Sequence, residues 1–144
     1  MSTQNFENHT KTVPAFHFVL LPVLLLTVVG SLVNLYHSLD DHSRLYSASL
    51  IVVLTVCLTM TTFCARIFAL KAQDRAIRAE ENLRHFVLTG KLLDPRLTAL
   101  QIVGLRFASD GEFAALAAKA ANESMAQKDI KRAIKSWRAD DYRV

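Results

Sequence analysis

Histidine and aspartate side chains gather at one place in the sequence where they could hold a divalent metal ion. His37 and His42 flank Asp40 and Asp41, and imidazole and carboxylate groups are common zinc ligands. The cluster contains no histidine pair at i,i+4 spacing and no cysteine. A solvated loop is therefore the favoured interpretation, and we expect no metal site.

A second candidate for chemistry is the carboxylate pair Glu80 and Glu81, because paired carboxylates can act as general acid and base. Arg78 precedes Glu81 by three residues and Arg84 follows Glu80 by four, a spacing that forms salt bridges on a helix surface. The sequence has no P-loop, dinucleotide-binding, nucleophile-elbow, HExxH or CxxC motif. We predict no catalytic residue, no cofactor and no enzymatic activity.

The charged residues are divided unevenly between the two halves of the chain. Residues 1–70 contain 6 of them and residues 71–144 contain 24. A single soluble domain does not segregate its charge in this way. The division indicates a chain with one part in lipid and one part in water.

Two uncharged runs in the first half are long enough to cross a membrane. No charged residue occurs for 28 residues after Lys11 or for 21 residues after Arg44, and a membrane-spanning helix needs about 20 apolar residues. A buried hairpin in a soluble protein and a cleaved signal peptide are the alternatives. The first would leave too few residues to cover it, and the second lacks the small-residue cleavage site.

These runs divide the chain into six parts. The fold class is all-α: a membrane-anchored helical hairpin followed by a small cytoplasmic helical module. The parts are an N-terminal tail (1–14), a first transmembrane helix (15–37), an external loop (38–46), a second transmembrane helix (47–69), a helical extension (70–90) and a three-helix module (91–144).

The distribution of lysine and arginine predicts the orientation in the membrane. The connecting loop has one such residue, Arg44, whereas five follow the second span within about 20 residues: Arg66, Lys71, Arg75, Arg78 and Arg84. The N-terminal tail carries Lys11 and the free amine. Both termini are therefore expected in the cytoplasm, with the loop outside.

Small and hydroxyl side chains form a stripe on each predicted span. Such residues let helices approach closely in lipid, so we expect them to pack the two spans together, with self-association of several copies as the alternative. The stripes are Thr27, Gly30, Ser31 and Asn34 on the first span, and Thr55, Thr59 and Thr62 on the second.

The second helix is predicted to continue beyond the membrane. Residues 66–88 contain no glycine or proline, and Gly90 is a plausible C-terminal stop. Four apolar residues continue a stripe among the charges of this extension: Leu70, Ile77, Leu83 and Val87. We expect one helix over 47–88.

Three capping signals predict three short helices after Gly90. Asp94 precedes a proline, Ser109 and Glu112 form the S-x-x-E box, and Ser124 begins an S-x-x-Q box. The first helix would bury Leu97, Leu100, Val103 and Phe107, and the last would bury Ile130, Ala133, Ile134 and Trp137.

The last predicted helix also gathers cations opposite its apolar stripe. A solvated basic face, contact with anionic lipid head groups and a helix-turn-helix reader of nucleic acid are the alternatives. The half from residue 71 has 14 basic and 10 acidic residues, so nucleic-acid binding is disfavoured. The cations are Lys128, Lys131, Arg132, Lys135 and Arg138.

Three stretches of the chain resemble a family of small bacterial membrane proteins. They are QNFENHTKTVPAFHFVLLP (4–22), LLDPRLTALQIVGLRFASDGEF (92–113) and IKRAIKSWRAD (130–140). That family is a domain of unknown function covering nearly the whole chain, and some members carry an automatic label of ABC transporter permease. The resemblance implies bacterial origin, two transmembrane helices and a helical tail, and it implies no activity.

We therefore expect a non-enzymatic anchor or adaptor in the bacterial inner membrane, in contact with lipids and with a protein partner or a second copy. The alternatives are an accessory subunit of a transporter or other membrane complex and, with lower weight, a membrane-tethered nucleic-acid binder. The candidate interaction residues are Lys131, Lys135, Trp137 and Arg138 in the tail, with Phe6, His9, Phe16 and His17 near the inner interface.

Overall fold

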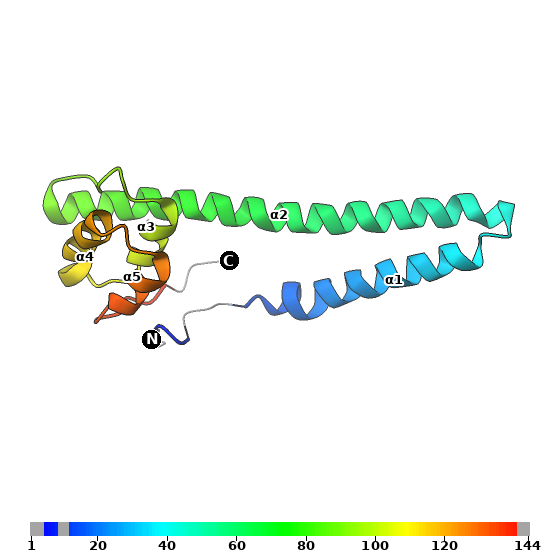
Figure 1. The fold of residues 1–144 in the computed structure, drawn as a ribbon, viewed down its shortest axis with the longest axis horizontal. Helices are drawn as coiled ribbons and strands as arrows, with labels where there is room; N and C mark the ends of the chain where they lie inside the picture. The colour runs from blue at the N-terminus through cyan, green and yellow to red at the C-terminus, as the bar shows by residue number, and fades with distance from the viewer. Residues whose placement is uncertain (1–4, 9–11, 141–144) are drawn as a thin grey trace. The chain divides into compact units, whose positions relative to one another are not determined.

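The computed structural model describes residues 5–8 and 12–140 (Figure 1). Within these residues it is all-α, as predicted, and its only β-type pairing is an isolated antiparallel bridge between Ala108 and Trp137. The chain divides into two compact units. We call residues 11–69 the hairpin unit, and residues 70–144 together with 1–10 the module unit.

The hairpin unit contains two helical segments joined by a short turn. A π-helix, η1 (Ala15–Leu20), continues directly into α1 (Leu21–His37), and α2 begins after the turn at His42 and ends at Thr89. Pro22 has no N–H to donate, and the widened π-helical segment ends two residues before it, at Leu20. In the turn, the Asp41 carboxylate accepts hydrogen bonds from the backbone N–H and hydroxyl of Ser43.

The two helices of the hairpin contact each other through a seam with a seven-residue repeat. The repeat matches the spacing at which paired helices keep one face toward each other. At its centre the hydroxyls of Ser31 and Thr55, both buried, lie 3.2 Å apart. The buried positions of the seam are Leu24, Ser31 and Ser38 on the first segment, and Ala48 and Thr55 on the second.

The remaining surface of the hairpin unit is apolar and exposed. Leu26, Leu54 and Phe68 are exposed by 71%, 67% and 66%, although a water-soluble monomer rarely exposes a large contiguous apolar surface. In the described part of the chain, Ala15–His37 and His42–Thr89 are long and apolar enough to cross a membrane by length and composition, and only 11% of the apolar window of each is buried.

α2 is a single helix from His42 to Thr89, which agrees with the continuity predicted for 47–88. It ends where the sequence predicted a stop. Gly90 has a φ of +73°, a left-handed conformation that glycine adopts without a steric penalty. The Gly90 N–H donates to the carbonyl of Phe86 at 2.8 Å, which closes the last turn of the helix.

The module unit consists of the last part of α2 and three short helices that gather beside it (Figure 1). These are α3 (Ala99–Leu105), α4 (Asp110–Asn122) and α5 (Gln127–Ala133), and α3 packs against both of the others. Their shared core contains four fully buried large side chains: Leu105, Phe107, Phe113 and Ile130.

The start of α3 differs from the prediction. Asp94 and Pro95 form a turn, in which the Leu97 N–H donates to the Asp94 carbonyl, and the helix begins four residues later. Its cap is Thr98, whose hydroxyl accepts from the Gln101 N–H while the Gln101 side chain accepts from the Thr98 N–H. Of the four residues predicted to be buried, Leu97, Val103 and Phe107 are buried, whereas Leu100 is 58% exposed.

The other two predicted capping boxes do not form. α4 begins after Ser109 as predicted, but the Ser109 side chain makes no capping bond. α5 begins after Ala126, also without a side-chain cap, and Ser124 instead adopts a φ of +49° in the turn before it. α5 ends at Ala133, so Ile134 and Trp137 belong to an extended segment and not to a helix face.

A close approach between α3 and α5 makes Gly104 sensitive to substitution. A Cβ at this position would lie 3.2 Å from both Cγ and the carbonyl oxygen of Gln127. We expect Gly104→Ala to lower the free energy of unfolding of the module by up to about 2 kcal/mol, since the strain of overpacking a close backbone contact exceeds the helix propensity that alanine gains. Gly111→Ala is the control, because that position has open space and alanine favours a helix by up to about 1 kcal/mol. Denaturation monitored by tryptophan fluorescence measures both, and equal effects would contradict the prediction.

Candidate functional site

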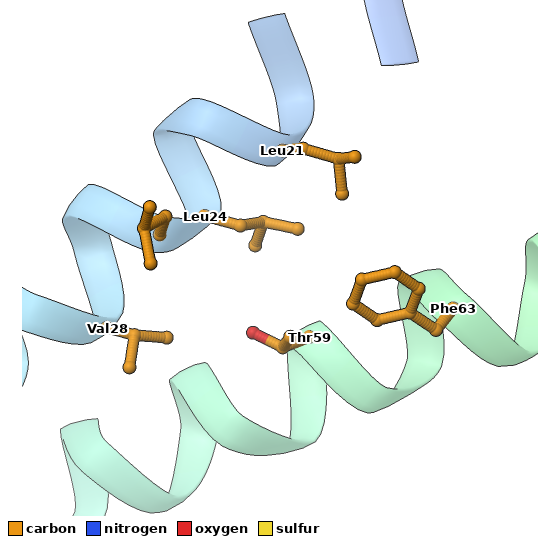
Figure 2. Close-up of a pocket in the computed structure, with 6 residues that line it drawn as sticks. Leu21, Leu24, Val28, Thr59 and Phe63 are labelled. Carbon is orange, nitrogen blue, oxygen red and sulfur yellow. The ribbon is translucent and has the colours of Figure 1, made fainter. Parts of the chain in front are cut away.

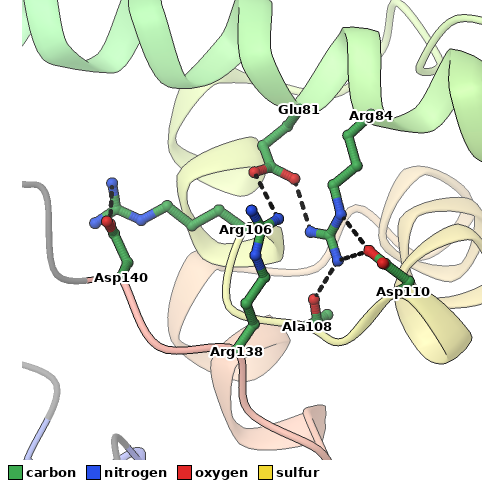
Figure 3. Close-up of polar contacts among 7 residues, drawn as sticks. All are labelled: Glu81, Arg84, Arg106, Ala108, Asp110, Arg138 and Asp140. Atoms are coloured by element: carbon green, nitrogen blue, oxygen red, sulfur yellow. Dashed lines mark hydrogen bonds and ion pairs between the residues drawn. The ribbon is translucent and has the colours of Figure 1, made fainter. Parts of the chain in front are cut away.

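Two oppositely charged side chains, one buried and one nearly so, lie on the face of α2 that contacts the module. Glu81 is 6% exposed, and its carboxylate Oε2 accepts a hydrogen bond of 2.9 Å from Nη1 of Arg84 (Figure 3). The side chain of Arg84 is only 11% exposed. The sequence predicted surface salt bridges from Arg78 to Glu81 and from Glu80 to Arg84, whereas in the structure Arg84 pairs with Glu81, between α2 and the short helices. We call the ionic contacts that converge on Glu81 and Arg84 the buried network.

Arg84 uses its whole guanidinium group to join three parts of the module. Besides Glu81, it donates from Nε to Oδ1 of Asp110 at 2.7 Å and from Nη2 to the carbonyl of Ala108 at 2.7 Å. Its plane lies over the ring of Phe113, 4.3 Å from the ring centre. A planar fork with several fixed donors suits this arrangement, and a lysine could not reproduce it.

A C-terminal segment, residues 134–140, closes the network from the other side. Nη1 of Arg138 lies 3.9 Å from Oε1 of Glu81, and the Arg138 N–H donates to the carbonyl of Phe107 at 2.7 Å. Arg106, a buried cation, pairs with Asp140 at 3.1 Å. Both charge pairs therefore connect the C-terminal segment to the core of the module (Figure 3).

Glu112 explains why the predicted capping box is absent. Its two carboxylate oxygens accept hydrogen bonds from the backbone N–H groups of Lys135, at 3.1 Å, and Ser136, at 2.8 Å. The side chain therefore points away from the start of its own helix and holds the C-terminal segment. In return, the Ser109 N–H donates to the Ser136 carbonyl at 3.0 Å.

Burial raises the pKa of a carboxylate, whereas hydrogen bonds to its charged form lower it, and the module contains an example of each. The pKa of Glu81 is raised, chiefly because burial disfavours its charged form, and the hydrogen bond and charge of Arg84 oppose that rise only in part. Its contribution to stability is therefore largest below its ordinary pKa and falls as the pH rises. Half-buried Asp94 behaves in the opposite way, since hydrogen bonds from Arg96 lower its pKa to about 2, and its contribution to stability is lost as the pH falls.

The hairpin unit contains an apolar cavity of about 330 Å³ between α1 and α2 (Figure 2). The one polar side chain in its lining, Thr59, donates its hydroxyl to the carbonyl of Thr55. The cavity therefore offers hydrocarbon contact and no recognition of a polar substrate. It is lined by Leu21, Leu24, Leu25, Val28, Thr59 and Phe63.

A family model described as "Family of unknown function (DUF6526)" matches residues 1–144 of the sequence. The chain belongs to this family. No curated protein and no solved structure matches it. The network and the cavity of this DUF6526 protein must therefore be interpreted from their own chemistry.

In the DUF6526 chain, the predicted tail residues surround the buried core instead of forming one helical face. Trp137 lies with its ring centre 5.1 Å from that of Phe107, and Lys131 places Nζ 5.3 Å from the centre of the same ring. Lys135 contributes its backbone N–H to Glu112, and Arg138 belongs to the buried network.

The predicted N-terminal residues divide between the two units. Phe6 lies under the guanidinium of Arg132, 5.4 Å away, in the module unit. Phe16 is in the hairpin unit, where it contacts Arg66 at 5.4 Å and the ring of His17 at 5.2 Å. His9 lies outside the described residues.

Among the predicted packing residues, Ser31 and Thr55 meet in the seam, and Thr59 and Thr62 are half-buried beside it. Three others are exposed on the outer side of the first segment: Thr27, Gly30 and Asn34. The described residues contain no group of three histidine, cysteine, aspartate or glutamate side chains placed to hold a metal ion.

Sequence reasoning missed the burial of charged side chains in the DUF6526 module, although one signal was available. Arg106 interrupts the apolar run IVGLRFA at 102–108, and a charge inside such a run indicates a buried cation that needs a carboxylate partner. Asp110 and Glu112 carried no comparable signal, because acidic residues are common in the first turn of any helix.

Proposed function

We propose that this protein is a non-enzymatic anchor or adaptor in the bacterial inner membrane, with both termini in the cytoplasm. The observation that carries the proposal is the composition of α2. Its first half exposes large apolar side chains such as Leu54 and Met60, and its last half holds a packed module through Ile77, Glu81 and Arg84. One helix thus combines a surface suited to lipid with an attachment site for a module suited to water.

The buried network supports an adaptor rather than a catalyst. Both carboxylate oxygens of Glu81 face arginine side chains, and Arg84 donates its hydrogen bonds to Glu81, Asp110 and Ala108 of the same chain. Charges that are satisfied in this way hold the module in one shape and are not available to a substrate. A module with a defined shape presents a constant surface to a partner.

Membrane insertion can be tested by cysteine labelling in intact cells. With Cys57 and Cys64 replaced by alanine, Asp40→Cys should react with a membrane-impermeant maleimide from outside, and Lys128→Cys should react only after lysis. Asp40 and Lys128 are both exposed, so burial does not explain a difference. Labelling of Lys128→Cys in intact cells, or extraction of the protein by alkaline carbonate, would contradict the proposed topology.

Co-purification in mild detergent tests the adaptor role. We expect a partner protein or a homo-oligomer to accompany the full chain. A partner ATPase would instead favour an accessory subunit of a transporter, and bound nucleic acid would favour a tethered nucleic-acid binder. A monodisperse monomer without any partner would contradict the adaptor proposal.

A further inference from the structure

The part of α2 in the module unit has a second apolar face that nothing in the described chain covers. Ile77 is 6% exposed and faces the module, whereas Leu83, Phe86 and Val87 are exposed by 64%, 50% and 75%. The single stripe predicted for Ile77, Leu83 and Val87 is therefore divided between two faces. At 100° per residue, Leu83 and Phe86 lie on the side of the helix away from Ile77 and Glu81.

The exposed face follows the spacing of a coiled coil. Its residues are separated alternately by four and three positions, which is the spacing of the two core positions of a heptad repeat. Three of them are alanines, which let two helices approach closely. We call this set the 72–86 seam: Ala72, Ala76, Ala79, Leu83 and Phe86, all exposed.

We propose that the 72–86 seam binds the same seam of a second copy of this chain, as a parallel pair of α2 helices. The proposal rests on the proposed function, because two copies inserted in one membrane with the same topology must carry their α2 helices in the same direction. Tethering to the membrane also raises the local concentration of the seams. A seam of two heptads, which would be too short to pair stably in free solution, is therefore sufficient.

Charge complementarity selects the parallel pairing. With Ala76 and Ala79 as core positions, Arg75 and Glu80 occupy the two flanking positions that form interhelical salt bridges in coiled coils. They are five residues apart, so a parallel pair in register places Arg75 of each copy beside Glu80 of the other. An antiparallel pair would instead bring like charges together. Both side chains are exposed, and neither forms an ion pair within the described residues of one chain.

Disulfide cross-linking in native membranes tests the seam directly. In the full chain with Cys57 and Cys64 replaced by alanine, mild oxidation of Ala79→Cys should give a disulfide-linked dimer. Lys71→Cys is the matched control, because it is exposed on the same helix but lies off the seam. We expect about tenfold less dimer from the control, since a disulfide needs Cα atoms within about 7 Å. Equal yields at the two positions, or no dimer at Ala79→Cys, would overturn the proposal.

Charge exchange tests the direction of the pairing. In the Ala79→Cys background, Arg75→Glu and Glu80→Arg should each reduce the yield of dimer several-fold, and the double exchange should restore it. A double variant no better than the single ones would overturn the parallel arrangement. Unchanged tryptophan emission verifies that each variant retains a folded module.

Carbonate extraction of the same membranes separates the two proposals. If the Ala79→Cys variant stays in the membrane and fails to cross-link, the proposed pairing of the 72–86 seams is wrong and the proposed membrane anchor still stands. Extraction of the protein from the membrane would contradict the proposed function. It would also remove the membrane tether that the pairing of the 72–86 seams requires.

Discussion

Arg84→Met is expected to lower the free energy of unfolding of the module by about 3–5 kcal/mol, because it leaves a buried carboxylate without its main partner. Glu81 already has a raised pKa through burial, and in the variant only the more distant Arg138 remains, at 3.9 Å. The substitution also removes the donors to Asp110 and to the Ala108 carbonyl.

Trp137 provides the measurement. It is the single tryptophan of the chain, and it packs on Phe107 in the core, so its emission should shift to longer wavelength when the module opens. Urea titration in mild detergent then compares the variants with the unmodified protein.

Two further variants distinguish the contribution of the positive charge of Arg84 from that of its planar guanidinium group. Arg84→Lys keeps the charge but loses the planar fork, so we expect a smaller loss. The double variant Glu81→Leu and Arg84→Met removes both charges and should be more stable than Arg84→Met alone, as found for buried pairs replaced together. A double variant less stable than the single one would contradict the assignment of Arg84 as the counter-charge of Glu81.

Phe107→Ala is expected to destabilise the module by about 3–5 kcal/mol through the cavity that it leaves. Phe107 is fully buried, and its carbonyl and ring hold Arg138 and Trp137. The variant should therefore also loosen the C-terminal segment and shift the emission of Trp137 before global unfolding.

Leu100→Ala is the matched control for this cavity. Leu100 belongs to α3 but is 58% exposed, so its removal should cost less than about 1 kcal/mol. The same urea titration reports both changes. A cost for Leu100→Ala as large as that for Phe107→Ala would mean that the face of α3 has been assigned incorrectly.

The sequence was sufficient to predict the large elements. The all-α class and the single long helix followed from uninterrupted apolar and helical periodicity, because no glycine or proline breaks the run before Gly90. Such features depend on local sequence, and local sequence is what periodicity measures.

The capping signals were less reliable because they compete with tertiary contacts. Glu112 is available in principle to Ser109, but the backbone of Lys135 and Ser136 binds it instead. The real cap of α3, Thr98 with Gln101, has the same S/T-x-x-E/Q pattern and was readable from the sequence. Asp94 and Pro95, four residues earlier, offered a second start signal that formed only a turn.

The buried network was unpredictable for a different reason. The spacing of Glu81 and Arg84 suggests a pair, but their burial and their remaining partners depend on residues 24 to 57 positions further along the chain, namely Ala108, Asp110 and Arg138. No periodicity within one element contains that information. The exposed 72–86 seam was hidden in the same way, because only the packing of Ile77 shows which face of α2 is left uncovered.

The C-terminal segment also sets an order of events during synthesis. Arg84 precedes Arg138 by 54 residues, so at about 5–20 residues per second the ribosome needs roughly 3–11 seconds to deliver the residues that close the network. Until then Arg138 cannot contact Glu81, and Trp137 cannot pack on Phe107. The newly made chain therefore completes its module only after residues 134–140 have been synthesised.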